Sequence, residues 1–450
     1  MGEEHSRLDA WYRRNIDQIR LFEPLHACGA VQQVSGTMIH SRLPSARVGE
    51  LCRIRRDNDN DLLAEIVGFN QHDAILSALG GIEGVCLGHR VEPLGHVHQV
   101  SVSDRLLGQV LDGFGRAMES DGEQAFADAQ SPWGTEVIGP ARPATRRPRI
   151  TEKLETGIRA LDGMLTFGVG QRIGLFAGAG CGKTTLLAEI ARNVSCDVIV
   201  FGMVGERGRE LREFLDHELD EELRTRSIVV CATSDCSSME RSRAAFTATA
   251  IAEDFRRRGK HVLLLIDSLT RYARAQREIG LAAGEPLGRG GLPPSVYSML
   301  PRLAERAGLT EEGAITAIYT VLIEQDSMND PVADEVRSLL DGHIVLSRKL
   351  AEQGHYPAID VLASLSRTQA NVVDQNHRRD AGNLRRLLSA YADVEMMLRL
   401  GEYEPGHQPL TDLAVDTRED VQRFLRQELR DPFPVSATLG YLSELTEHVS

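Results

Sequence analysis

The sequence predicts an α/β protein with a central parallel sheet, a small β-barrel before the sheet and a helical region after it. Between about residues 170 and 365, continuous apolar runs such as RIGLFA and HVLLLID alternate with longer helical segments, which is typical of a parallel sheet buried on both faces. Residues 27–94 instead carry short β-type runs separated by Gly, Pro or Asn/Asp clusters. Beyond about residue 375 the chain is polar with helical spacing, so helices are expected there.

Length and charge exclude several classes of protein. A chain of 450 residues is long enough for roughly two or three domains. Its 51 Lys and Arg against 65 Asp and Glu give a net charge of −14, which argues against a dedicated nucleic-acid-binding protein. No apolar run reaches the roughly 18 residues needed to span a bilayer, and no secretory signal is found, so we expect a cytoplasmic protein. Seven scattered cysteines, none in a CxxC pair, are expected to be reduced thiols.

The N-terminal part of the chain predicts a helix followed by a barrel. In residues 1–20 the apolar positions lie mostly three or four apart, as in a short amphipathic helix that packs on its own domain or contacts a partner. Four basic and four acidic residues cancel there, which disfavours electrostatic membrane binding. Residues 21–95 predict a barrel of five or six strands. Phe69 is almost its only aromatic residue, which favours a structural or assembly role over oligonucleotide binding.

Two further domains are expected after the barrel. Residues 96–375 contain the alternating strands and helices and are expected to form one α/β domain, which the glycine-rich segment described next marks as nucleotide-binding. Within them, residues 140–160 hold six basic residues and three prolines and predict an exposed connection with solvated charges. Residues 376–450 are expected to form a small C-terminal helical domain.

A glycine-rich segment between a predicted strand and helix has the composition of a phosphate-binding loop. Glycines let successive backbone N–H groups and a helix N-terminus face a phosphate, a following Lys reaches the β- and γ-phosphates, and a Thr hydroxyl ligates Mg²⁺. Ala177 stands where the strict motif has its first glycine, but the three later glycines and the GKT sequence are intact. The candidate nucleotide-binding residues are Gly178, Gly180, Cys181, Gly182, Lys183, Thr184 and Thr185. Cys181 is read as a small residue that fits the loop, with oxidation blocking the site as a minor hypothesis.

Two acidic residues follow apolar strands and should lie at the edge of the sheet where ligands bind. Asp267 ends HVLLLID and would orient Mg²⁺ through water, cap the next helix, or do both. Glu206 follows DVIVFGMV and could polarise an attacking water molecule. Arg207 and Arg209 beside it would otherwise be surface charges.

Longer segments occur in a fixed order and resemble a known family. They are VGERGRE, LLLIDSLTRYARAQREIG, PPSVYSMLPRLAERAG, ITAIYTVL, DPVADEVRSLLDGHIVLSR and GHYPAIDVLASLSR. Together with LLGQVLDGFGR and GEYEPG they resemble the type III protein-secretion ATPases, homologues of rotary ATP synthase catalytic subunits. The resemblance implies a RecA-like P-loop core, and MNDPVADEVRSLLDGHIVLSR is closer to the injectisome branch than to the flagellar one. Leu292 in place of a Tyr and Gln109 in place of an Arg depart from the family pattern.

The resemblance implies roles for individual residues. Lys183 and Thr184 would act on phosphate and Mg²⁺, and Glu206 would be the base that positions water. The remaining matches are Arg207 and Arg271 with γ-phosphate contacts, Glu210 with a carboxylate near Mg²⁺, Tyr356 with an aromatic residue beside adenine, and Arg367 with an arginine finger from a neighbouring subunit. By itself, Arg367 could be an ordinary structural arginine.

The function implied is hydrolysis of ATP, with Mg²⁺, by a homohexameric ring that unfolds export substrates and releases them from chaperones. The implied partners are secretion stalk and stator or regulator proteins and chaperone–substrate complexes, with no nucleic acid. Membrane association, at the inner face of the bacterial inner membrane, would be indirect through partners. The alternatives are a flagellar protein-export ATPase, an ATP synthase-type subunit, a hexameric RNA translocase, and a nucleotide-gated docking platform whose hydrolysis is incidental.

Overall fold

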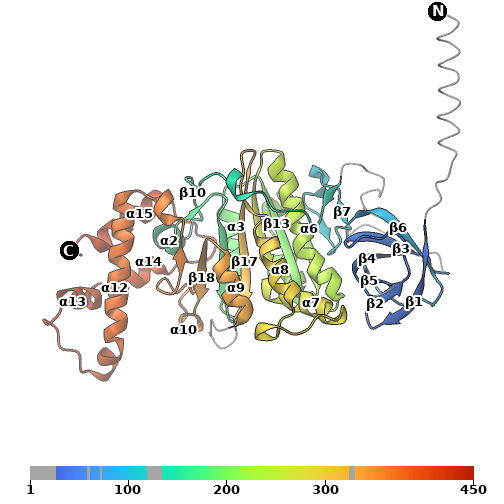
Figure 1. Cartoon of the computed structure of the whole chain (residues 1–450). Coiled ribbons are helices and arrows are strands. Elements are labelled where there is room, and N and C mark those ends of the chain that lie inside the picture. Colours follow the sequence, from blue (N-terminus) through green and yellow to red (C-terminus); the bar gives the residue numbers. More distant parts are fainter. Residues whose placement is uncertain (1–26, 58–60, 71–72, 119–133, 324–329, 450) are drawn as a thin grey trace, which may run out of the picture. The chain divides into compact units, whose positions relative to one another are not determined.

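The computed structural model describes residues 27–449 apart from 58–60, 71–72, 119–133 and 324–329 (Figure 1). The amphipathic helix predicted for residues 1–20 lies outside this part of the chain. Two compact units are present, Met1–Val97 and His98–Ser450, and each is described by itself. Within the ranges described, no helix has both the length and the apolar character that crossing a membrane requires.

The first unit is a closed antiparallel barrel of six strands, in the order β1-β2-β5-β4-β3-β6. The strands are β1 (Gly29–Ser35), β2 (Met38–Ser41), β3 (Glu50–Ile54), β4 (Leu62–Phe69), β5 (Ala74–Ala78) and β6 (Arg90–Val97). Each coincides with one of the β runs in the sequence. Ile39, Ile54 and Ile66 are fully buried in its core, because alternate residues of each strand point into the barrel.

The second unit is built on a nine-stranded sheet in the order β19-β18-β12-β17-β15-β13-β14-β8, with β16 paired beside β17. The strands are β8 (Val110–Leu111), β12 (Arg172–Ala177), β13 (Val198–Glu206), β14 (Ser227–Thr233), β15 (His261–Asp267), β16 (Gly308–Leu309), β17 (Ala314–Leu322), β18 (Gly342–Leu346) and β19 (Leu365–Ser366). All pairings are parallel except those of β16 and β19. The parallel sheet predicted from the apolar runs is confirmed.

Helices cover both faces of this sheet. They are α2 (Arg159–Met164), α3 (Lys183–Asn193), α4 (Gly208–Glu213), α5 (Glu221–Thr225), α6 (Ser238–Arg257), α7 (Leu269–Ala282), α8 (Pro294–Ala304), α9 (Pro331–Leu339), α10 (Arg348–Glu352) and α11 (Gln369–Val372). Every residue of β13 is buried, and alternate residues enter two different cores: Phe201 packs in the one with α3, and Val200 in the one with α6. Residues 209–219, one of the helical segments between the apolar runs, are helical over nearly their whole length, since α4 passes directly into a π-helical turn at Phe214–Glu218.

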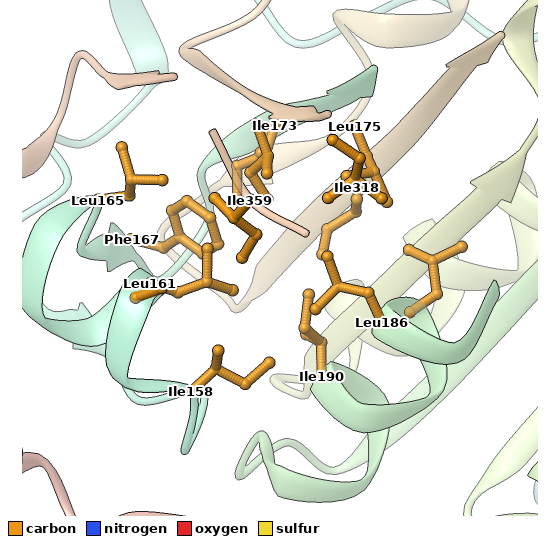
Figure 2. Close-up of a cluster of buried hydrophobic side chains, with 14 of the residues drawn as sticks. Ile158, Leu161, Leu165, Phe167, Ile173, Leu175, Leu186, Ile190, Ile318 and Ile359 are labelled. Carbon is orange, nitrogen blue, oxygen red and sulfur yellow. The ribbon is translucent and has the colours of Figure 1, made fainter. Parts of the chain in front are cut away.

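A hydrophobic core anchors the helix that follows the glycine-rich loop (Figure 2). Leu186 and Ile190 of α3 belong to the same cluster as Ile173 of β12 and Leu161 of α2. The start of α3 is therefore held on a packed layer rather than on a mobile connection.

The C-terminal part of the chain is helical, as predicted, with α12 (Gln375–Leu400), α13 (Pro409–Asp416), α14 (Arg418–Leu425) and α15 (Val435–Thr446). Phe424 of α14 is fully buried against α2, where a Cβ on Gly163 would lie 2.9 Å from its ring. These helices lie in the same compact unit as the sheet, so a separate domain at residues 376–450 stays a prediction.

Two arginines of the 140–160 connection contradict the expectation that its charges face solvent. The connection carries the short strand β10 (Lys153–Leu154), which pairs with β11 (Phe167–Gly168). Arg147 forms an ion pair with Glu305 and donates to the carbonyl of Arg142 at 3.0 Å. Arg159 donates to the carbonyl of Phe424 at 2.9 Å, which ties the end of α14 to α2. These arginines bind main-chain and carboxylate oxygens that the chain brings together only on folding.

Candidate functional site

The loop between β12 and α3 has a backbone that depends on its glycines. Gly180 and Gly182 have φ angles of 80° and 81°, a region that residues with a Cβ rarely adopt. Gly178 directly follows β12, and Lys183, Thr184 and Thr185 form the first turn of α3. Free N–H groups at a helix N-terminus attract anions, so the loop can hold a phosphate. Ala177 is the last, fully buried residue of β12, so its departure from the strict motif leaves the loop glycines unaffected.

Three charged side chains converge beside this loop. Lys183 Nζ forms an ion pair with Asp267 Oδ1 and lies 3.6 Å from Glu206 Oε1. Asp267 and Glu206 end β15 and β13, which are neighbours in the sheet, and both carboxylates are at least nine-tenths buried. Thr320 Oγ1, from β17 between β12 and β15, donates to Asp267 Oδ1 at 2.7 Å. Thr320 is not among the predicted site residues, because its only signal in the sequence is a polar residue inside an apolar strand.

The alternative role of Asp267 as a helix cap is wrong. Ser268 is the N-cap of α7, and its hydroxyl accepts from the Arg271 N–H at 3.4 Å. The Asp267 carboxylate faces Lys183 and Thr320 instead.

Glu206 has the environment of a carboxylate that can exchange a proton near neutrality. Burial, together with the nearby charge of Asp267, raises its pKa from 4.5 to about 7, although Lys183 and Arg271 oppose the rise. Its Oε2 accepts from Arg271 at 3.0 Å, whereas its buried Oε1 accepts no hydrogen bond from the described residues. Arg271 also donates to the carbonyl of Gly205, whose φ of +67° and missing Cβ leave room for the arginine. This arrangement fixes one carboxylate oxygen and leaves the other able to accept from a reactant.

Two other predicted residues lie at the margin of this cluster. Arg207 is 76% exposed, and its guanidinium donates to Glu210 Oε1 at 2.9 Å rather than pointing toward Lys183. The pKa of Glu210 is lowered, mainly by a hydrogen bond with Glu206 and to a smaller extent by the neighbouring Arg207 guanidinium. The structure therefore brings Glu210 next to Glu206, and it does not bring Arg207 to the phosphate-binding loop of its own chain.

A cavity of about 1040 Å³ adjoins the loop and reaches the C-terminal helices. Gly182, Thr185 and Tyr356 line it, and a Cβ on Gly182 would lie 3.7 Å from the Tyr356 ring. The buried Cys181 also lines it, and its 2% exposure limits access for an oxidant. The far wall comes from Glu419, Gln422, Arg423, Arg426, Gln427, Glu428, Leu429 and Asp431. None of these residues is among the predicted site residues, because no local motif marks a segment that reaches the loop only through folding.

Arg367 lies at the opposite edge of the sheet from the phosphate-binding loop. Its N–H donates to the Asp341 carbonyl at 2.9 Å, and the Asp341 N–H donates to the carbonyl of Arg172, the first residue of β12. The loop begins after the last residue of that six-residue strand. At about 3.3 Å per residue, the two ends of β12 are roughly 17 Å apart. The exposed Arg367 therefore cannot serve the loop of its own chain.

The two departures from the family pattern lie away from this cluster. Leu292 is buried before α8 and packs in the core beside α6. The carbonyl of Gln109 accepts from the Val229 N–H at 3.1 Å. Neither side chain contacts the charged cluster.

Three family models match the chain. The nucleotide-binding domain of the ATP synthase alpha/beta family matches residues 157–366, and the beta-barrel domain of that family matches residues 31–95. The T3SS EscN ATPase C-terminal domain matches residues 373–444.

Curated relatives and solved structures agree with these models. The type 3 secretion system ATPase of Pseudomonas savastanoi pv. phaseolicola is 61% identical over 446 residues, 99% of each chain. The flagellum-specific ATP synthase of Bacillus subtilis is 43% identical, covering 96% of this chain and 98% of the relative. The assembled ATPase EscN of enteropathogenic E. coli superposes with a TM-score of 0.87 at 44% identity, covering 93% of this chain and all of that one. EscN in complex with its central stalk EscO gives 0.84 at 43% identity, with the same coverage.

Proposed function

The chain belongs to the family of type III secretion system ATPases, and from this premise we propose that it hydrolyses ATP to energise type III protein secretion, acting as a homohexameric ring that unfolds export substrates and releases them from chaperones. One observation carries the proposal: the structure gathers Lys183, Glu206 and Asp267 beside the loop but places Arg367 at the far edge of the sheet. A single chain thus holds both halves of a site that two subunits complete.

In this proposal each half of the site has a distinct task. The loop N–H groups and the Lys183 ammonium bind the phosphates of ATP, and Tyr356 in the cavity wall lies beside the adenine. Glu206 accepts a proton from the attacking water through Oε1 while Arg271 holds Oε2. Arg367 of a neighbouring subunit stabilises the charge that develops on the transferred phosphoryl group, an effect worth about 10³ to 10⁵ in rate in other nucleotide hydrolases.

The oxygen ligands at the site suit Mg²⁺. The Thr184 hydroxyl, the Asp267 carboxylate and, at the margin, the Glu210 carboxylate are the hard oxygen donors that this cation prefers. Mg²⁺ supplies neutralisation of phosphate charge when it is bound. Asp267, held by Thr320, is the best-fixed of these oxygens.

The secretion branch, the partners and the location in the cell are proposed from the similarity to known proteins. The relatives include both type 3 secretion system ATPases and flagellum-specific ATP synthases, and the 61% identity to the former against 43% for the B. subtilis protein supports the injectisome branch. The EscN–EscO complex supports a central stalk protein as a partner. We further propose stator or regulator proteins and chaperone–substrate complexes as partners, and a position at the inner face of the bacterial inner membrane reached through them.

Replacing Glu206 by Gln tests the catalytic proposal. The variant keeps the shape of the side chain but cannot take up a proton, so kcat should fall by about 10²- to 10⁴-fold while nucleotide affinity and assembly are kept. Glu213→Gln is the matched control, because Glu213 pairs with Arg209 on the exposed surface of α4. Phosphate release by the purified oligomer and secretion by the complemented strain are the two measurements.

Wild-type turnover of Glu206→Gln would overturn the catalytic assignment. Normal secretion by a Lys183→Ala strain that lacks ATPase activity would overturn the energising role and favour a docking platform.

A further inference from the structure

A buried glutamine holds the backbone on both sides of Arg367. Gln171, which precedes β12, is fully buried, and its side-chain amide uses all of its hydrogen-bonding directions. Nε2 donates to Ser366 Oγ at 3.1 Å, and Oε1 accepts from Thr368 Oγ1 at 2.6 Å. The glutamine thus binds the residue before Arg367 and the residue after it.

The same amide also reaches the acceptor of the Arg367 N–H. Nε2 donates to the Asp341 carbonyl at 3.1 Å, and this carbonyl accepts from the Arg367 N–H at 2.9 Å. The Asp341 carboxylate is bound by Arg172, with Oδ2 to Nε and Oδ1 to a terminal nitrogen both at 3.0 Å. Gly342 permits this close approach, since a Cβ there would lie 2.6 Å from the Leu365 carbonyl and 3.2 Å from Gln171 Nε2.

The Arg367 side chain has little of its own to fix its direction. It is exposed, and its one hydrogen bond in the described structure is a 3.4 Å contact with the Arg337 carbonyl. The position and direction of the Arg367 side chain are therefore set by the backbone of β19 and by the backbone of Arg367 itself, which follows that strand. A displacement of about 1 Å in a catalytic group can cost on the order of 10²-fold in rate.

We propose that Gln171 is a positioning residue for the arginine finger: through Ser366, Thr368 and the Asp341 carbonyl it fixes the backbone from which Arg367 reaches the nucleotide of the neighbouring subunit. This inference rests on the proposed function of Arg367. It also requires that substitution of Gln171 slow hydrolysis in the neighbouring subunit's site and leave the phosphate-binding loop of its own chain unaffected. This is a strict requirement, because β12 alone separates Gln171 from that loop in the sequence.

Mixed rings test this requirement. Gln171→Met keeps the length of the side chain and removes its hydrogen bonds, so in rings of this variant alone kcat should fall about 10- to 100-fold with the KM for ATP changed less than about twofold. Lys183→Ala rings are inactive but carry intact fingers. Mixing the two variants places a Lys183→Ala finger against the intact loop of a Gln171→Met subunit, and activity should recover.

Two comparisons make the outcome decisive. The mixture of Arg367→Ala and Lys183→Ala should also recover activity, because it too places an intact arginine against an intact loop. Thr316→Val removes another fully buried hydroxyl, which accepts from the Gly170 N–H, and rings of this variant alone should stay active. If the Arg367→Ala mixture recovers and the Gln171→Met mixture does not, the positioning role is wrong. If the Arg367→Ala mixture itself stays inactive, the proposed finger is wrong. If Gln171→Met fails to fold, Thr368→Val, which loses the 2.6 Å hydrogen bond to Gln171, replaces it in the same mixing experiment.

Discussion

At the scale of single residues, hydrogen-bond partners distinguish two buried carboxylates that look alike in the sequence. Glu206 and Asp267 both end apolar strands, but Asp267 binds Lys183 and Thr320, while Glu206 keeps one oxygen that accepts no hydrogen bond from the described residues. The charge of Asp267 adds to the effect of burial on Glu206, so Asp267 raises the proton affinity of Glu206.

The raised pKa of Glu206 predicts the pH dependence of activity. In the proposed mechanism the unprotonated carboxylate acts as the base, so kcat/KM should rise with pH through about 7. The residual activity of Glu206→Gln should lack this rise, and Glu213→Gln should keep it. Initial rates measured across about pH 6 to 8 decide this, and an unchanged pH profile in Glu206→Gln would contradict the role of the base.

The same shift predicts an effect on stability with a definite sign. Because folding raises the pKa, the contribution of Glu206 is fully present below about pH 4.5 and is lost as the pH rises through about 7. Glu206→Gln should therefore gain in melting temperature relative to the wild type across this window, and Glu213→Gln should not. Melting curves recorded at several pH values would show the effect.

At the scale of elements, the site depends on where strands end and where α3 begins. β12, β15 and β13 all run in the same direction, so the residues at their carboxyl ends meet at one edge of the sheet. The buried residues of α3 fix its first turn against β12 and α2 (Figure 2). The loop between them can then hold its glycine conformation.

Substitution of Gly182 tests this element. Gly182→Ala forces a Cβ into a left-handed backbone at φ 81°, at a cost of roughly 1 to 2 kcal/mol, and we expect nucleotide affinity to fall by about tenfold. Gly208→Ala at the start of α4 is the matched control, since its φ is ordinary and a Cβ there meets nothing within 4 Å. Titration with a fluorescent ATP analogue measures both. Equal affinities would show that the loop does not need this conformation.

At the scale of the whole molecule, one chain carries a phosphate-binding loop at one edge of its sheet and Arg367 at the other. In the proposed ring of identical subunits each loop would meet a neighbour's Arg367, an arrangement that a monomer cannot provide. Two solved structures hold EscN, which has a similar fold, in an assembled form, one of them in complex with its central stalk EscO.

Turnover should therefore depend on protein concentration. Dilution separates loops from neighbouring arginines, so ATP hydrolysis per chain should fall steeply over the range in which sedimentation shows the oligomer dissociating. Arg367→Ala should remain inactive at concentrations where it is fully assembled. A rate per chain that is the same for monomer and oligomer would contradict a shared site.

The sequence by itself determined the strands, the loop and the two strand-end carboxylates, because apolar periodicity and glycine content act locally. It also predicted the barrel strands one by one. Only the tertiary structure decided that Ser268 and not Asp267 caps α7, that Thr320 holds Asp267, that the segment around Gln427 lines the cavity, and that Gln171 binds the residues on both sides of Arg367. The hydrogen bonds of Gln171 alone join residues as many as 197 positions apart, and no local pattern specifies which buried polar groups will meet when the chain folds.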